Sequence, residues 1–133
     1  MSISRHTFSK DERLRSKKVI EKIIAEGKSI NQNPFRLNWV VTELTTKFPA
    51  QLAIAVPKRF FKRAVDRNRI KRLVREVYRK NKSGMYALLQ SKKLQCALLL
   101  VYSGRTIPEY PEVEKKILLT LQRFEETILK NFG

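Results

Sequence analysis

Basic and amide side chains are interspersed with apolar ones in DRNRIKRLVREVYRKNK, residues 66–82. Guanidinium groups match phosphate oxygens with two parallel hydrogen bonds, and an asparagine amide can donate to and accept from a base or ribose. At the 3.6-residue period of a helix the two kinds of residue separate onto opposite sides. The apolar side holds Ile70, Leu73, Val74 and Val77, and the polar side holds Asn68, Lys71, Arg72, Arg75 and Arg79. The segment predicts a helix that packs through one face and binds a polyanion through the other.

Other interpretations of this helix are less favoured. A merely solvated face would place acidic residues three or four positions from the basic ones, and inside the helix only Glu76 is available, beside the arginine row. A helix-turn-helix needs a helix directly before Asp66, where a strand and a loop are indicated, and a basic zipper needs leucine heptads. A membrane-surface helix would leave free the apolar face that the core needs here. Recognition of an RNA backbone is the favoured interpretation.

No group of side chains suited to catalysis accompanies this helix. His6 is the sole histidine, and Cys96 lies within an apolar stretch typical of a core strand. A nuclease that uses two metal ions needs several clustered carboxylates, whereas the only aspartates, Asp11 and Asp66, stand at predicted helix starts. We therefore predict no catalytic and no metal-binding residue, and expect the protein alone to be inert.

The positive charge is concentrated in one region. The 133-residue chain has a net charge of +17, from 29 lysines and arginines against 12 acidic residues. Residues 58–82 carry a net charge of +10, whereas residues 109–133 carry −1. A local excess of this kind favours a binding face for a polyanion, of which nucleic acid is the most common.

Length and composition predict one domain over residues 1–133, in which residues 1–12 form a mobile N-terminal segment. A single cysteine allows no internal disulfide, and the N-terminus lacks the apolar stretch of a secretory signal. The longest apolar run, CALLLVY, is too short to cross a membrane. We expect a cytoplasmic protein without a membrane partner.

The N-terminal half predicts a helix followed by two strands. Ser16 is the expected N-cap and Gly27 the expected end of the helix, although Ser9 and Glu12 have the spacing of a capping box and could begin an earlier turn. The helix has one apolar stripe, Val19, Ile20, Ile23 and Ile24. Residues 35–44 and 51–57 are rich in β-branched and aromatic residues and predict strands joined by a hairpin loop.

The C-terminal half predicts two helices around a buried strand. The basic helix should run from an N-cap at Asp66 to about Asn81, with Gly84 as a stop signal. Residues 94–104 are almost continuously apolar, which indicates a central or parallel strand covered on both faces. A final helix carries Pro111 in its first turn. Its inner stripe is Val113, Ile117, Leu121, Phe124, Ile128 and Phe132. The element order, helix, two or three strands, helix, strand, helix, predicts an α+β sandwich.

The stretch RNRIKRLVREVYR, residues 67–79, resembles the arginine-asparagine-arginine signature of the bacterial ribonuclease P protein subunit. The preceding IAVPKRFFKRAVD is similar to the strand and loop that lead into that signature. The stretches RLRSKKVIEKIIAEGKS, FRLNWV and QCALLLVYSG are similar to the family's first helix, second element and closing strand. The resemblance covers roughly residues 13–130.

The resemblance implies a small basic protein in a ribonucleoprotein whose RNA performs catalysis. That particle removes the 5′ leader of precursor tRNA by hydrolysis that requires Mg²⁺, which is held mainly by the RNA. The implied partners are the catalytic RNA and precursor tRNA, with no DNA. The implied fold is an α-β sandwich, shared with the second domain of a small-subunit ribosomal protein, in which the signature helix lies in a left-handed β-α-β crossover.

The resemblance also implies two binding regions. The catalytic RNA would contact Lys58, Arg59, Arg67, Asn68, Arg69, Lys71, Arg72, Arg75 and Arg79. The leader would lie in a cleft between the first helix and the sheet, lined by Ile20, Ile24, Phe35, and Trp39 or Asn38. The family commonly has phenylalanine at the two isoleucine positions, and isoleucine offers contact area without a π face. Core packing is the alternative role for both isoleucines.

The loop KRFFKRAVD is about one residue longer than the family's usual form. Phe60 and Phe61 within it either fill the core or stack on a base. Two other functions stay open. One is a ribosome-associated protein that binds structured RNA without leader processing, and the other is a basic regulator that prefers duplex DNA and dimerises.

Overall fold

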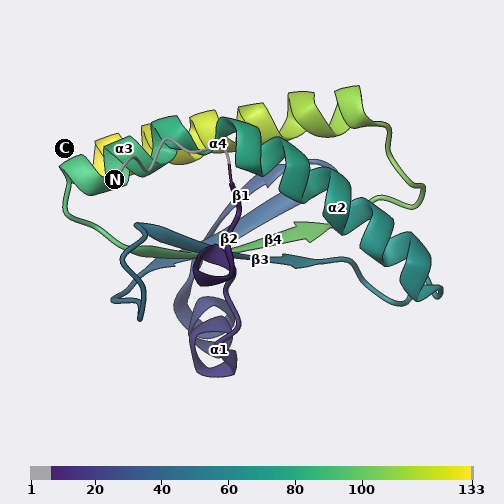
Figure 1. Ribbon diagram of the computed structural model, residues 1–133, viewed down its shortest axis with the longest axis horizontal. Helices are drawn as coiled ribbons and strands as arrows, with labels where there is room; N and C mark the ends of the chain where they lie inside the picture. The colour runs from purple at the N-terminus through teal and green to yellow at the C-terminus, as the bar shows by residue number, and fades with distance from the viewer. Residues whose placement is uncertain (1–6, 133) are drawn as a thin grey trace.

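The computed structural model describes residues 7–132, which form a four-stranded sheet with α1 on one face and α2, α3 and α4 on the other (Figure 1). The elements are a 3₁₀ turn Lys10–Glu12, α1 Lys17–Glu26, β1 Lys28–Gln32, β2 Phe35–Val41, β3 Ala50–Ala55, α2 Ala64–Asn81, α3 Ser83–Ser91, β4 Cys96–Tyr102 and α4 Tyr110–Phe132. The expected α+β sandwich is confirmed.

The strands are ordered β1-β2-β4-β3. β2 pairs antiparallel with both β1 and β4, whereas β3 pairs parallel with β4. β4 is therefore central, which explains why its side chains are apolar on both faces. The connection from β3 to β4 contains α2 and α3, so the signature helix lies in a β-α-β crossover as the resemblance implies.

Side-chain alternation along β2 divides the core into two parts. Phe35, Leu37 and Trp39 are buried beneath the three-helix layer, where the Trp39 ring meets Phe124 edge-on with centroids 5.2 Å apart. A smaller cluster beneath α1 is centred on Ile23, which is only 2% exposed. Because successive strand residues point to opposite faces, Asn38 and Trp39 cannot share a surface.

The predicted ends of α1 are confirmed. The Ser16 hydroxyl accepts a hydrogen bond of 3.2 Å from the Val19 N–H, and Gly27 follows the last helical residue. A Cβ at Gly27 would lie 2.4 Å from the Ile23 carbonyl oxygen, so a larger residue does not fit there. The predicted apolar stripe is wider than the buried one, because Ile24 is 73% exposed.

The basic helix starts earlier than predicted, and Gly84 does not stop the chain from being helical. α2 begins at Ala64 with Arg63 as its N-cap, and Asp66 lies in the first turn. After the break at Lys82, α3 begins at once and includes Gly84. The short α3 packs through Met85, Tyr86 and Leu89, a set that the sequence interpretation missed.

Two further differences concern the edge strand β1 and the last residue of α4. β1 was not predicted, because KSINQ is polar and Ile30 is its only buried side chain. Its position at the sheet edge explains that composition. Phe132 was predicted in the inner stripe of α4 but is 41% exposed, whereas the other five members of the stripe are buried.

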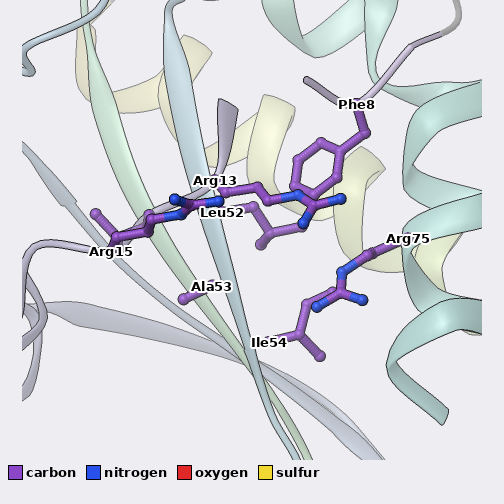
Figure 2. A pocket seen from close by; sticks show the side chains of 8 residues that line it. Phe8, Arg13, Arg15, Leu52, Ala53, Ile54 and Arg75 are labelled. Carbon is purple, nitrogen blue, oxygen red and sulfur yellow. The ribbon is translucent and has the colours of Figure 1, made fainter. Parts of the chain in front are cut away.

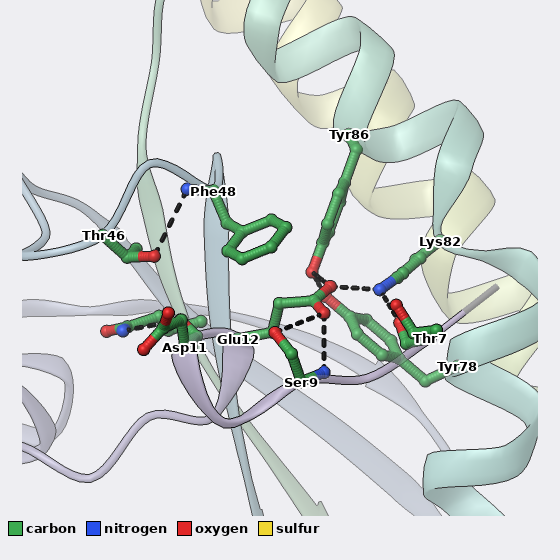
Figure 3. Close-up of polar contacts among 10 residues, drawn as sticks. Thr7, Ser9, Asp11, Glu12, Thr46, Phe48, Tyr78, Lys82 and Tyr86 are labelled. Atoms are coloured by element: carbon green, nitrogen blue, oxygen red, sulfur yellow. Dashed lines mark hydrogen bonds and ion pairs between the residues drawn. The ribbon is translucent and has the colours of Figure 1, made fainter. Parts of the chain in front are cut away.

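Within residues 7–12, the N-terminal segment is joined to the helical layer by a buried ion pair (Figure 3). Ser9 and Glu12 form a capping box, with the Ser9 N–H donating to the Glu12 carboxylate over 2.8 Å. The same carboxylate is fully buried, pairs with Lys82 and accepts a hydrogen bond of 2.8 Å from the Tyr86 hydroxyl. Residues 1–6 of the predicted mobile segment lie outside the described residues.

We expect Lys82→Met to lower the free energy of unfolding by about 3–5 kcal/mol, because it leaves the buried Glu12 carboxylate without its cation. Urea denaturation measures the change. Lys80→Met, which removes a cation from an exposed pair with Glu76, is the matched control and should hardly move the midpoint. Equal midpoints for the two variants would contradict a structural role for the buried pair.

The same pair predicts a dependence of stability on pH. Burial opposes ionisation of Glu12, but hydrogen bonds from Lys82, Ser9 and Tyr86 outweigh it and lower the pKa of the carboxyl. Its contribution to stability is therefore complete above the unfolded pKa, about 4.3, and is lost as the pH falls through the lower folded value. Glu12→Gln should remove this part of the acid slope of the unfolding free energy.

Candidate RNA-binding surfaces

The outward face of α2 forms the first candidate surface. Ile70, Val74 and Val77 are completely buried against the sheet and α4, with Tyr78 beside them. Of the polar residues predicted to face outward, Asn68, Arg69 and Arg72 are exposed, whereas Lys71, Arg75 and Arg79 are half-buried. The predicted division of the helix into an apolar and a basic face is present.

Two of the predicted RNA-binding arginines have partners within the protein. The Arg67 guanidinium donates to the carbonyl oxygens of Phe61 (2.7 Å) and Lys62 (3.0 Å), and so holds the loop before α2. Arg79 forms an ion pair of 2.6 Å with Glu76, which lowers the pKa of the Glu76 carboxyl and raises the pKa of Arg79. From its position beside the arginine row, Glu76 therefore neutralises one end of that row.

Arg75 turns toward a pocket at the edge of β3, where it meets arginines of the N-terminal segment (Figure 2). The pocket is lined by Phe8, Arg13, Leu14, Arg15, Leu52, Ala53, Ile54 and Arg75. Burial, and the positive charge of Arg13, lower the pKa of the Arg75 guanidinium. Three cations therefore converge on one concave surface, an arrangement that an anion would stabilise.

Arg13 and Arg15 reach this pocket because the N-terminal segment runs along β3. The Leu14 N–H donates to the Leu52 carbonyl oxygen over 3.0 Å, and Leu14 is buried between the two arginines. The Arg13 guanidinium lies over the Phe8 ring, 5.5 Å from its centroid. The sequence interpretation missed both arginines, since their place depends on a contact between residues almost forty positions apart.

The loop between β3 and α2 separates the roles of its two phenylalanines. Phe61 is buried, and its ring centroid lies 6.2 Å from that of Tyr102. Phe60 is half-buried beside the exposed Arg59. Phe61 is therefore the residue that fills the core. Lys58, at the start of this loop, is exposed.

The structure corrects the predicted lining of the leader cleft. Phe35 and Trp39 are buried on the sheet face covered by α2 and α4, so neither can line a cleft beside α1. On the α1 side, β2 presents the exposed Arg36 and the half-buried Asn38, whose amide donates to the Leu99 carbonyl over 3.4 Å. This sheet face offers hydrogen-bonding groups where aromatic rings were expected.

The two isoleucines of α1 have different surroundings. Ile20 is half-buried against the cluster that contains Ile23, whereas Ile24 is largely exposed. Core packing therefore explains the buried part of the Ile20 side chain, but it does not explain why an isoleucine stands at the exposed position 24. Since Ile24 lies one helical turn beyond Ile20, both present apolar surface on the same side of α1.

Cys96, considered and rejected as a catalytic group in the sequence, lies apart from these surfaces. Cys96 is buried in β4, and burial raises the pKa of its thiol to about 12, so the thiol stays protonated. His6 lies outside the described residues. Within residues 7–132, no three histidine, cysteine or acidic side chains gather as metal ligands would. None of the helices in that range combines the length and apolar character needed to cross a membrane.

Comparisons with known proteins agree with this architecture. The family model described as Ribonuclease P matches residues 8–124. The ribonuclease P protein component of Porphyromonas gingivalis is 32% identical over 116 residues, which cover 87% of this chain and 85% of its own. The corresponding protein of Chlorobium phaeobacteroides is 30% identical, with 84% of each chain covered.

Solved structures show the same fold. The RNase P protein of Thermotoga maritima superposes with a TM-score of 0.66 at 26% identity, over 84% of this chain and 96% of that one. The RNase P protein of Staphylococcus aureus superposes with a TM-score of 0.65 at 21% identity, over 93% and 100% of the two chains. With the family model and the relatives both matching most of its length, this chain belongs to the ribonuclease P protein family.

Proposed function

We propose that this chain is the protein subunit of ribonuclease P and binds the catalytic RNA through the outward face of α2 and the adjoining arginine pocket. The observation that carries the proposal is the convergence of Arg13, Arg15 and Arg75 on one pocket at the β3 edge. Cations gathered in this way repel one another, and a partner with closely spaced negative charges offsets that repulsion. An RNA backbone, with one phosphate per nucleotide, has that property.

The chemistry of α2 supports RNA rather than a general anion. Arg72 and Arg69 are exposed and can bind phosphate oxygens with two hydrogen bonds each, whereas Asn68 can contact a base or a ribose hydroxyl. The buried face of α2 is held by the core, so the basic face is presented on a rigid element. Rigid presentation suits a folded RNA, because less conformational entropy is lost on binding.

We further propose that the leader of precursor tRNA lies on the sheet face beside α1. Arg36 would contact a leader phosphate, Asn38 a base edge, and Ile20 and Ile24 the apolar faces of bases. This placement gives the protein a preference for precursor over mature tRNA, since only the precursor has a leader. It uses hydrogen bonds and apolar contact in place of aromatic stacking.

The protein would contribute position and charge, and the RNA the hydrolysis. Mg²⁺, which the family's reaction requires, supplies an activated water and stabilises charge on phosphate oxygens when bound. The residues of this chain do not fit a site for it, because acidic side chains are not grouped in the described part. We assign Mg²⁺ to the RNA and derive no step from the protein.

The decisive experiment mixes the protein with a bacterial ribonuclease P RNA and precursor tRNA at low Mg²⁺. We expect removal of the 5′ leader to depend on the protein, because its positive charge replaces part of the counterion requirement of the RNA. RNA binding without leader removal would point to a structural RNA-binding protein. Preferential binding to duplex DNA would contradict the proposal outright.

We expect Arg72→Ala and Arg13→Ala each to weaken assembly with the catalytic RNA and to lower the slope of log K against log salt by roughly 0.7–0.9 per lost phosphate contact. Titration at several salt concentrations measures both effects. Lys130→Ala, an exposed change of equal charge at the C-terminal end of α4, is the control and should parallel the unmodified protein. If the Arg72 variant behaves like this control, the outward face of α2 is not part of the RNA-binding surface.

The leader assignment predicts that Arg36→Ala weakens binding of precursor tRNA to the assembled particle by about threefold to tenfold, or roughly 0.7–1.4 kcal/mol. Binding of mature tRNA should not change, because it lacks the leader. The ratio of the two dissociation constants is the measurement, with Lys130→Ala again as control. An equal loss for both tRNAs would show that Arg36 contacts the catalytic RNA or the tRNA body.

A further inference from the structure

Arg105, in the connection from β4 to α4, contacts the same aromatic ring as Arg59, although the two are distant in the sequence. Both guanidiniums lie over the ring of Phe60, Arg59 with its carbon 4.8 Å from the ring centroid and Arg105 at 4.0 Å. Arg59 and Arg105 are exposed, whereas Phe60 is half-buried. We define these three residues as the Phe60 stack.

Contacts from the core hold the first loop of this stack. The N–H groups of Phe60 and Phe61 both donate to the Pro57 carbonyl oxygen over 3.3 Å, which closes a tight turn. Arg67, the first arginine of the signature, binds the Phe61 and Lys62 carbonyls from α2. Phe61 is buried against Tyr102, and the half-buried Phe60 packs against the same core.

Tyr102 also holds the second loop. Its hydroxyl donates to the Thr106 carbonyl oxygen over 2.8 Å, next to Arg105. A Cβ at Gly104 would lie 2.2 Å from the Tyr102 hydroxyl oxygen, so a residue without a side chain lets the loop close over the ring. One aromatic residue therefore positions both loops, through Phe61 on one side and Thr106 on the other.

We propose that the Phe60 stack is a phosphate-binding site for the backbone of the catalytic RNA, with Arg105 as a binding residue and Phe60 as the residue that positions both arginines. This inference rests on the proposed function. A guanidinium held over an aromatic ring keeps its N–H donors at its edge, where a phosphate oxygen can accept from them. Ordering on the ring also reduces the side-chain entropy that each arginine loses on binding.

The position of the stack favours the catalytic RNA over the leader. Arg59 and Phe60 lie in the loop that leads directly into α2, and Arg67 of α2 binds that loop. The stack therefore continues the basic surface of α2 around its N-terminal end. In Figure 1 the connections before α2 and α4 lie at the same end of the molecule, opposite the end of α4. Arg105 thus extends the predicted surface with a residue from a different part of the chain.

The test measures the affinity of four single variants and one double variant for the catalytic RNA alone, over a range of salt concentrations. We expect Arg105→Ala to weaken binding by roughly threefold to tenfold and to lower the salt slope by about 0.7–0.9. Phe60→Leu should also weaken binding although it changes no charge, whereas Phe60→Tyr, which keeps the ring, should bind as the unmodified protein does. Lys130→Ala is the charge control.

The combination Phe60→Leu with Arg105→Ala should lose less affinity than the two single losses together, because the residues act as one unit. Thermal unfolding of each variant identifies a loss caused by misfolding, and Arg105→Ala tests the site independently of the loop. If Arg105→Ala matches Lys130→Ala, the site is overturned. If Phe60→Leu binds normally while Arg105→Ala does not, the positioning role of the ring is overturned.

A loss seen only with leader-bearing tRNA, and not with the catalytic RNA alone, would overturn the choice of partner. Failure of the unmodified protein to bind the catalytic RNA would instead reject the proposed function itself. The two failures are distinguishable. A failure of the proposed function affects every variant, whereas a wrong choice of partner affects only the variants at the Phe60 stack.

Discussion

The buried ion pair between Glu12 and Lys82 is the contact on which the arginine pocket depends. It joins the N-terminal segment to the junction of α2 and α3, and Tyr86 adds a hydrogen bond to the same carboxylate. Arg13 follows Glu12 directly, so the place of its guanidinium follows from where the pair holds the backbone. The ion pair of Lys82 with Glu12 therefore helps to position Arg13 and Arg15, in a chain with a net charge of +17.

Helical periodicity divides α2 into a face that packs in the core and a face that is basic. Its apolar residues complete the core beneath α4, and its basic residues are left on the outside. Not all of these basic residues are equivalent. Arg67 stabilises the preceding loop and Arg79 is paired with Glu76, whereas Arg72 is exposed and Arg75 contributes to the pocket. A row of arginines in a sequence therefore contains both members with structural contacts and members left available to a ligand, which only the three-dimensional contacts distinguish.

The sequence predicted the three helices with strong periodicity, although the cap assignment held for α1 and failed for α2. It predicted the central strand from its continuous apolar run. It missed β1, whose single buried side chain, Ile30, gives no alternation signal, and α3, whose Gly84 resembles a terminator. For the site, the sequence left Trp39 and Asn38 as alternatives for the cleft lining, and only the packing of the helices on the two sheet faces distinguishes them. Arg15 and Arg105 could not be assigned, because long-range contacts bring them to their surfaces.

The N-terminal segment also changes what the edge of the sheet can do. β3 is an edge strand, and its outer backbone would ordinarily be available for pairing with a strand of another molecule. Here the Leu14 N–H already donates to the Leu52 carbonyl oxygen. Arg13, Arg15 and Arg75 also place positive charge at the same edge. If two copies approached each other through β3, each would meet a partly covered strand, and the arginines of the two copies would repel one another. The arrangement that gathers cations at this edge thus also disfavours edge-to-edge aggregation of the protein.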